Sequence, residues 1–403
     1  MRVKIEKGRA KGTITAPPSK SMAHRLLIAA ALADGVSVVR GISDCEDVLA
    51  TVDCLRAFGA DIELTGNMAT VRGFDPTLSA PVGELCARES GSTLRFLLPI
   101  ALLARNEVRF VGAERLMQRP MEVYEQLCKD QALTFRRDVG ITVKGPMICK
   151  DIYMSGDVSS QFITGMLFSL PFLGGERRIH ITTDIESRSY IDLTLRAMRE
   201  FGVMAVWEDE RTLLVPEGSR YSAREVAVEG DFSGAAFPEA LKLFAGEVTV
   251  LGLSEDSLQG DRVYREYFKR LSAGHAELSI KDCPDLGPVL IAVAAAKSGA
   301  VIKDTRRLKI KESDRAAAMA EELSKLGAKV TVNEDSVVIT PSKLHAPTEP
   351  LCGHGDHRIV MSLAVLLTCL GGEISGAEAV AKSYPGFFED LSSLGIGVEV
   401  YEA

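Results

Sequence analysis

The chain has 403 residues, and 47 Lys and Arg against 55 Asp and Glu give it a net charge of −8 at pH 7. A content of 46% hydrophobic and 25% charged residues is that of an ordinary globular protein, which excludes disordered and fibrous chains. The acidic balance argues against a protein that coats nucleic acid or a membrane surface, and the length predicts two or three domains.

Several absences predict a cytosolic protein. The longest nearly apolar run, residues 359–370, is too short to cross a bilayer, and the chain start lacks the apolar core of a secretory signal. His354 and His357 could share a helical face, but Asp356 and Arg358 beside them favour an anion-handling turn over a metal site. Reduced thiols are expected at the eight scattered cysteines, residues 45, 54, 86, 128, 149, 283, 352 and 369.

A sixfold repeat runs along the chain. Short β-type runs begin at residues 36, 107, 178, 247, 300 and 372, and later strands are expected at 329–332 and 336–340. Four units carry a glycine suited to the left-handed end of a helix, at Gly59, Gly202, Gly327 and Gly395. This signal is degraded in the second and fourth units. The fourth unit is short, with 53 residues between its run and the next, so we expect it to lack a peripheral element.

A helix of small apolar residues precedes each run, most clearly at 26–33 and 289–296. A helix that is apolar on every side is buried, which predicts helices inside and sheets outside. Six units in two groups of three predict two similar domains, 1–16 plus 230–403 and 17–229, with chain crossings near Pro17-Pro18 and Gly230.

A short polar segment, called a polar phrase below, precedes each buried helix. Ser and Asp at these places are ordinary helix caps, yet helix N-termini also attract phosphate and carboxylate groups. Lys20, Arg25, Arg95 and Arg358 add more positive charge than capping needs. We therefore expect a cleft between the two domains that binds small polyanions. The phrases are Ser19-Lys-Ser21, Ser90-Gly-Ser92, Ser159-Ser-Gln161, Asp231-Phe-Ser233, Pro284-Asp285 and Asp356-His-Arg358.

These residues resemble the motifs of the EPSP synthase family of enolpyruvyl transferases, in order and over nearly the whole chain. The matching segments are Pro18-Ser-Lys-Ser-Met-Ala-His-Arg25, Gly91-Ser-Thr-Leu-Arg95, Gln118-Arg-Pro120, Gly156-Asp-Val-Ser-Ser-Gln161, Ser187-Arg-Ser-Tyr-Ile-Asp192, Gln259-Gly-Asp261, Pro284-Asp285, Lys311-Glu-Ser-Asp-Arg315, Gly355-Asp-His-Arg358 and Lys382-Ser-Tyr-Pro385. The resemblance implies an α/β fold, a two-domain inside-out barrel. Each domain is three βαβαββ repeats with buried parallel helices and outer sheets.

The resemblance also implies a reaction, in which the enolpyruvyl group of phosphoenolpyruvate passes to the 5-hydroxyl of shikimate 3-phosphate. The transfer runs through a tetrahedral intermediate that loses phosphate, and it belongs to the shikimate pathway to chorismate and aromatic amino acids. Metal and organic cofactors are not implied, and neither are nucleic-acid or membrane partners. The resemblance further implies a cytoplasmic monomer that is a target of glyphosate.

By matched position, three groups of residues carry this chemistry. The catalytic candidates are Asp285 as the base for the hydroxyl, with Glu312 and Lys20 handling protons at the enolpyruvyl carbon. Phosphoenolpyruvate would be held by Lys20, Gly91, Arg119, Gln161, Arg315, Arg358 and Lys382. Shikimate 3-phosphate would be held by Lys20, Ser21, Arg25, Ser159, Ser160, Gln161, Ser187, Tyr190, Asp285 and Lys311.

Other interpretations stay open. The segment 311–315 could be a solvated helical face, Asp192 a structural partner, and Phe387 with Phe388 core packing. Arg307 stands where many family members carry Asn. The alternative activities are a UDP-N-acetylglucosamine enolpyruvyl transferase and a phosphometabolite-binding protein without catalysis. The first is disfavoured by the absence of Cys from residues 113–120 and by the presence of Arg25.

Overall fold

The computed structural model describes residues 1–79, 81, 83–148 and 151–401 and divides into two units. The middle unit is Pro18–Glu229, and the terminal unit is Met1–Pro17 with Gly230–Ala403.

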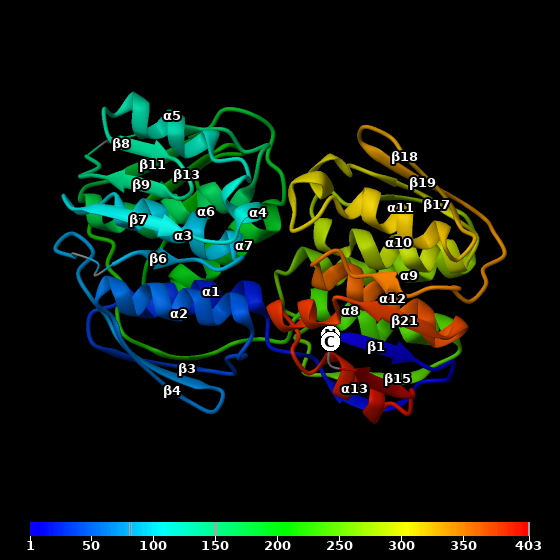
Figure 1. Cartoon of the computed structure of the whole chain (residues 1–403). Helices are drawn as coiled ribbons and strands as arrows, with labels where there is room; N and C mark the ends of the chain where they lie inside the picture. The colour runs from blue at the N-terminus through cyan, green and yellow to red at the C-terminus, as the bar shows by residue number, and fades with distance from the viewer. Residues whose placement is uncertain (80, 82, 149–150, 402–403) are drawn as a thin grey trace. The chain divides into compact units, whose positions relative to one another are not determined.

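The middle unit contains three four-stranded sheets of one design (Figure 1). In each sheet the first two strands pair parallel, and the following pairs are antiparallel. The strand orders are β14 (Glu225–Ala227), β3 (Val36–Arg40), β5 (Met68–Arg72), β4 (Asp61–Thr65); β6 (Leu85–Cys86), β7 (Glu107–Val111), β9 (Ile141–Lys144), β8 (Thr134–Arg137); and β10 (Asp151–Met154), β11 (Arg177–Ile181), β13 (Thr212–Val215), β12 (Val206–Trp207).

The core helices of the middle unit are α1 (Lys20–Ala31), α3 (Gly91–Ala101) and α6 (Ser160–Ser169). Ten of the 12 residues of α1 are buried, as expected for a helix without a polar face. Strands such as β3 alternate between buried and exposed residues, so one face of the sheet covers the helices. The remaining helices are α2 (Glu46–Phe58), α4 (Glu114–Met117), α5 (Glu122–Asp130), η1 (Leu170–Leu173) and α7 (Arg188–Glu200).

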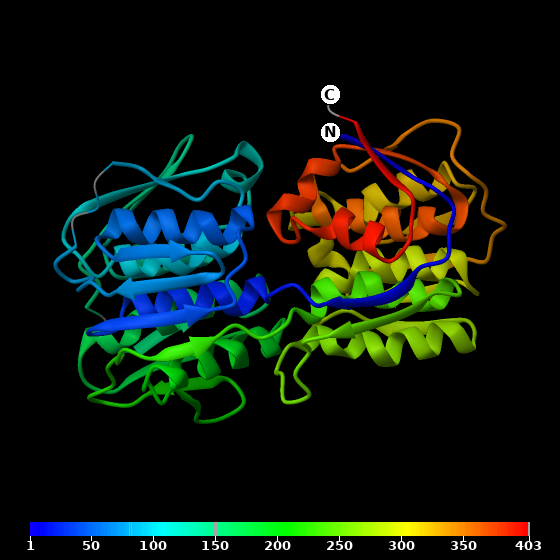
Figure 2. The same ribbon diagram turned by 90° about the horizontal axis from the view of Figure 1, so that it is seen from below.

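The terminal unit repeats this design with two changes. Its sheet β16 (Ala276–Ser279), β17 (Ala300–Lys303), β19 (Ser336–Thr340), β18 (Lys329–Val332) has the same order. In the sheet β20 (Leu351–Cys352), β21 (Gly372–Ser375), β1 (Arg2–Ile5), β22 (Val398–Tyr401), the two ends of the chain pair antiparallel, as Figure 2 shows. The third sheet has only β15 (Glu247–Leu251) and β2 (Lys11–Thr15) among the described residues.

The short fourth repeat explains this two-stranded sheet. Its outer helix α9 (Tyr264–Ala273) is followed directly by β16, where the first, second, third and fifth repeats insert an antiparallel hairpin. The prediction of a missing peripheral element is therefore confirmed. The other helices of the unit are α8 (Phe232–Ala240), η2 (Leu241–Phe244), η3 (Gly260–Val263), η4 (Pro284–Leu286), α10 (Gly287–Ala296), η5 (Arg306–Ile310), α11 (Arg315–Ser324), α12 (His357–Leu370), η6 (Ala377–Lys382) and α13 (Phe387–Ser393).

Glycines end the outer helices as the sequence predicts. Gly59, Gly202, Gly327 and Gly395 have φ of 115°, 90°, 85° and 83°, in the left-handed region that a side chain disfavours. In the second repeat Ala132 adopts the same region with φ of 54°. The degraded repeat thus keeps the turn without the glycine.

Across the described part of the chain, no helix combines the length and apolar character needed to cross a membrane. The cysteines within the described ranges are free thiols, as predicted, while Cys149 lies outside those residues. Phe387 and Phe388 are buried in the core of the terminal unit, which confirms that they serve packing.

Candidate active site

Five of the six polar phrases do cap helices. The side chains of Ser19, Ser90 and Ser159 accept hydrogen bonds from backbone N–H groups at the starts of α1, α3 and α6, at 3.4, 3.1 and 3.3 Å. Asp231 and Asp356 do the same for α8 and α12, at 3.0 and 2.9 Å. The sixth phrase differs, because the Asp285 side chain turns to neighbouring cations instead.

Arg25 is a buried cation in the middle unit, with 2% of its surface exposed. It donates to the backbone oxygens of Ser21 and Tyr190 at 2.7 and 2.9 Å, and to Thr194 Oγ1 at 2.9 Å. Among the residues that the structure describes, no carboxylate lies within ion-pair distance of Arg25, and burial lowers its pKa to about 10. A guanidinium held this way is suited to bind an anion.

A second group in the middle unit joins the starts of α3 and α6. Gln161 accepts from Arg95 Nη1 at 2.7 Å and donates to Ser92 Oγ at 3.1 Å. A Cβ atom on Gly91 would lie 2.8 Å from Nη1 of Arg119. The structure thus brings together the predicted residues Gly91, Arg119 and Gln161. Arg95, which also donates to the Pro120 carbonyl at 2.9 Å, belongs to the same group.

Lys20, the first residue of α1, pairs with a carboxylate that the sequence analysis missed. Its Nζ lies 2.7 Å from Oδ2 of Asp47, and the two side chains are 14% and 9% exposed. Asp47 lies in the first turn of α2, where an acidic residue is ordinary, so no sequence signal marked it.

The remaining predicted residues of the middle unit lie at helix starts. Ser159 and Ser160 are 6% and 3% exposed at the start of α6. Ser187, 1% exposed, precedes α7 with φ of 56°, a left-handed conformation that is uncommon for serine. Such strained residues concentrate at functional sites.

Arg315 is the centre of the cluster in the terminal unit, and it is 1% exposed. Its Nη1 donates to Asp285 at 2.9 Å, its Nη2 to Glu312 at 2.8 Å, and its Nε to Asp356 at 2.8 Å. The interpretation of residues 311–315 as a solvated helical face is therefore wrong. Asp356, fully buried, was expected only as part of a helix-start phrase and is here an ion-pair partner.

Two more cations contact Asp285. Lys311 Nζ lies 3.1 Å from Oδ1, and Arg358 Nη2 lies 3.5 Å from Oδ2. Burial alone would raise the pKa of Asp285, but the charges of Lys311, Arg358 and Arg315 hold it well below the usual range. Nε and Nη1 of Arg358 are buried and have no hydrogen-bond partner among the described residues, so both N–H groups are available to an anion.

Burial also lowers the pKa of Lys311, although Asp285 opposes the shift, and the nearby charges of Arg315 and Arg307 add to it. Arg307 is therefore a buried neighbour of this cluster, 8% exposed. Lys382, at the end of η6, donates to the Gly355 carbonyl at 2.5 Å, which ties it to the turn before α12.

Other residues of the matched motifs have structural roles. Asp192 accepts from the indole N–H of Trp207 at 2.8 Å, in agreement with a structural role. Gln259 bonds the Phe232 N–H and the Gly230 carbonyl, and so holds the start of α8. His354 has φ of 50° in a turn, whereas His357 begins α12, so the two do not share a helical face.

Fold and site together define a class of protein. Buried cations gather at helix starts in both units, and one group holds a carboxylate among three cations. This arrangement is that of an α/β enzyme that binds small anions and moves protons.

Comparisons with known proteins narrow this class. The family model described as EPSP synthase (3-phosphoshikimate 1-carboxyvinyltransferase) matches residues 5–391. The 3-phosphoshikimate 1-carboxyvinyltransferase of Clostridium kluyveri is 37% identical, over 98% of this chain and 97% of that protein. The enzyme of the same name from Clostridium botulinum (strain Eklund 17B / Type B) is 38% identical over 97% of both. The chain therefore belongs to the EPSP synthase family.

Solved structures agree in fold. EPSP synthase from Acinetobacter baumannii superposes with a TM-score of 0.79 at 22% identity, over 100% of both chains. The enolpyruvyl transferase NikO from Streptomyces tendae gives 0.78 at 16% identity, over 100% of this chain and 99% of that one. The mixed α/β fold predicted from the repeat is confirmed by these likenesses.

Proposed function

We propose that the chain transfers the enolpyruvyl group of phosphoenolpyruvate to the 5-hydroxyl of shikimate 3-phosphate. The hydroxyl oxygen bonds to the central carbon of the enol while the methylene carbon gains a proton. The tetrahedral intermediate then loses that proton together with phosphate, which restores the double bond. The observation that carries the proposal is Asp285, a carboxylate 21% exposed whose oxygens contact three cations of a kind that suit anionic substrates.

Shikimate 3-phosphate falls mainly to the middle unit. Arg25 would pair with its phosphate, and Ser21, Ser159, Ser160, Gln161, Ser187 and Tyr190 surround the same helix starts. Lys20 would exchange its ion pair with Asp47 for one with the substrate. The free-energy cost is small, because a substrate phosphate or carboxylate takes the place of the Asp47 carboxylate. Asp285 and Lys311 would reach the ring hydroxyls from the terminal unit.

Phosphoenolpyruvate needs groups from both units. Gly91, Arg119 and Gln161 form one group, and Arg315, Arg358 and Lys382 form the other. We propose that the two units meet around the substrates, with the domain division at residues 1–16 plus 230–403 and 17–229. Such convergence supplies clamps for one carboxylate and one phosphate.

Proton transfer is divided among three residues. Asp285 takes the proton of the attacking hydroxyl, while Glu312 and Lys20 handle the proton at the enolpyruvyl carbon. Glu312 is 14% exposed, and Arg315 binds its Oε2. We further propose a monomeric enzyme of the cytoplasm, without nucleic-acid or membrane partners, that is inhibited by glyphosate in the place of phosphoenolpyruvate.

The proposal is tested by phosphate release from phosphoenolpyruvate with three acceptors. Release is expected with shikimate 3-phosphate, far less with shikimate, and none with UDP-N-acetylglucosamine. Equal release with the nucleotide sugar would favour the sister transferase. No release with any acceptor, despite binding by calorimetry, would favour a binding protein without catalysis.

Arg25→Met tests the assignment of the shikimate 3-phosphate site. Losing the charge-assisted bonds is expected to raise the KM for shikimate 3-phosphate about 10- to 100-fold, with little change in the KM for phosphoenolpyruvate. A lower melting temperature is also expected, because the variant loses the bonds of Arg25 to the Ser21 and Tyr190 carbonyls, so the selectivity between the two KM values is the deciding readout. Arg56→Met, on the exposed part of α2, is the control. Equal losses for both substrates would count against the assignment.

A further inference from the structure

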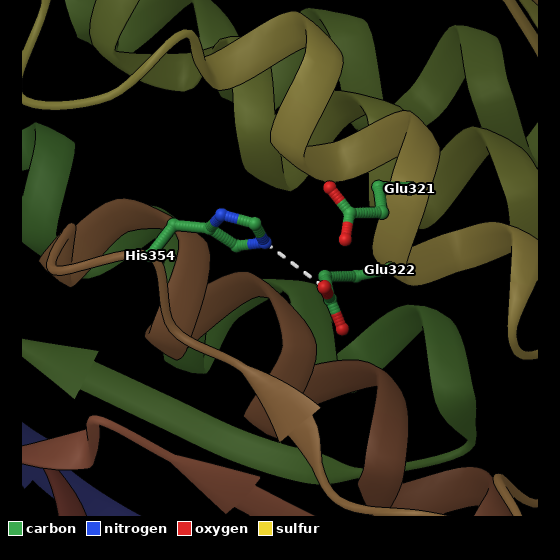
Figure 3. A group of neighbouring side chains, drawn as sticks. All are labelled: Glu321, Glu322 and His354. Carbon is green, nitrogen blue, oxygen red and sulfur yellow. Dashed lines mark hydrogen bonds and ion pairs between the residues drawn. The ribbon is translucent and has the colours of Figure 1, made fainter.

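Two glutamates of α11 and a histidine of the turn before α12 form a cluster. Glu321, Glu322 and His354 converge as metal ligands do, as Figure 3 shows. Glu322, however, has both carboxylate oxygens bonded already. Its Oε1 lies 2.9 Å from Nε2 of His354, its Oε2 accepts from the Cys352 N–H at 2.9 Å, and Lys325 Nζ lies 3.0 Å from Oε2. The positive charge beside Glu322 is thus supplied by Lys325 and not by a metal ion.

Glu322 holds the turn that leads into α12. His354 and Gly355 are consecutive left-handed residues, with φ of 50° and 61°, and the Asp356 N–H closes the turn on the Gly353 carbonyl at 2.9 Å. Beyond the turn, Asp356 binds Arg315 and caps the helix at Arg358. Lys382 donates to the carbonyl of Gly355 within the turn. The three phosphoenolpyruvate contacts proposed for the terminal unit, Arg315, Arg358 and Lys382, therefore each bond this turn or Asp356 beside it.

We propose that Glu322 is a positioning residue for phosphoenolpyruvate, an inference that rests on the proposed function. Arg315 begins α11 and Glu322 lies two turns further along the same helix, so its bonds fix the distance between that helix and the turn before Arg358. Glu322 is completely buried. Burying a carboxylate with its partners adds little net stability compared with apolar packing. Its benefit is therefore geometric, in holding the guanidinium groups of Arg315 and Arg358 in register.

The test compares four single variants and one double variant by steady-state kinetics with each substrate varied. Glu322→Ala is expected to raise the KM for phosphoenolpyruvate about tenfold or more, since small displacements of clamping groups are costly. The KM for shikimate 3-phosphate, held mainly by the middle unit, should stay near that of wild type. Glu322→Gln keeps an oxygen for the Cys352 N–H and should restore the KM to within about threefold of wild type.

His354→Asn and Glu321→Ala complete the set. Asn tolerates the left-handed conformation but is too short to reach Glu322, so it should raise the same KM. Combined with Glu322→Ala it should add nothing further, because the two act as one unit. Glu321→Ala removes an exposed carboxylate of the same cluster and should match wild type. If Glu322→Ala does not fold, His354→Asn with Glu322→Gln decides the matter.

The outcomes separate the inference from the proposed function. Wild-type protein that releases no phosphate with shikimate 3-phosphate overturns the proposed function itself. An active wild type whose Glu322→Ala and His354→Asn variants keep a normal KM for phosphoenolpyruvate overturns only the inference. Equal rises in both KM values, or a lower melting temperature with unchanged kinetics, also overturn it, since those results mean a general structural role.

Discussion

Asp285→Asn is expected to lower kcat by two or more orders of magnitude while leaving both KM values near or below those of wild type. General-base contributions are typically about 10²–10⁴-fold. Asparagine has the size of aspartate and its oxygen can still accept from Arg315 Nη1, now 2.9 Å away. It cannot take the proton of the hydroxyl. Turnover should therefore be lost while the fold of the site persists.

The charges around Asp285 give the sign of the binding effect. Lys311, Arg315 and Arg358 contact this carboxylate. Removing its negative charge leaves these cations less neutralised, so anionic substrates should bind at least as well. Loss of affinity together with loss of turnover is instead the signature of a disrupted site.

The same charges govern the basicity of Asp285. Cations hold its pKa well below the usual range for aspartate, so it is deprotonated in the free protein at neutral pH but is a weak base. Substrate phosphate and carboxylate groups would neutralise those cations and raise its pKa. On the proposed mechanism, substrate binding would thus supply the basicity that Asp285 needs to act as the base.

The measurement is steady-state kinetics with each substrate varied, together with single-turnover phosphate release and equilibrium binding of each substrate. Asp282→Asn, an exposed aspartate three residues earlier, is the matched control and should behave as wild type. A kcat for Asp285→Asn within a few-fold of wild type would remove Asp285 from proton transfer.

What the sequence could predict was set by local physics. Gly59 and its three counterparts predict helix ends because glycine, which has no Cβ, adopts the left-handed backbone conformation readily. That preference is a property of the residue itself and needs no distant partner. The buried helices follow from apolar residues on every side, as in α10, where nine of ten residues are buried. The missing hairpin of the fourth repeat follows from chain length.

What escaped prediction depends on pairs of distant residues. Asp47 meets Lys20 across 27 positions, and Glu322 meets the Cys352 N–H across 30. No periodicity records which side of a helix will face such a partner. The segment 311–315 could be solvated or buried by pattern alone, and only packing places Arg315 among three carboxylates. The family resemblance supplied Lys20, Arg315 and the carboxylates around Arg315, but neither Asp47 nor Glu322.

Gly91 carries the second large expected effect, and two explanations of this glycine can be separated. Backbone freedom does not require it, because Gly91 begins α3 and is absent from the residues with left-handed φ among those described. Space does. A Cβ atom there would lie 2.8 Å from Arg119 Nη1, 3.5 Å from Gln161 Oε1 and 3.7 Å from Arg95 Nη1.

Gly91→Ala should therefore act on phosphoenolpyruvate and spare shikimate 3-phosphate. The guanidinium of Arg119 is the end of a flexible side chain and can move aside, so the fold should tolerate the methyl group. The displaced Arg119 and the methyl group itself would both disturb phosphoenolpyruvate, raising its KM about tenfold or more and weakening glyphosate inhibition. Kinetics with each substrate and a melting curve provide the measurement.

Gly386→Ala is the matched control for this substitution, because an added Cβ at Gly386 meets no atom within 4 Å and its φ is ordinary. It should leave both KM values and the melting temperature unchanged. If Gly91→Ala instead lowers the melting temperature while glyphosate inhibition stays unaltered, the glycine serves the fold. If it raises both KM values equally, the two substrates share the start of α3, and the division of anions between Arg25 and Arg119 fails. If only the KM for phosphoenolpyruvate rises, glycine is needed at this position because phosphoenolpyruvate approaches the backbone of α3 closely.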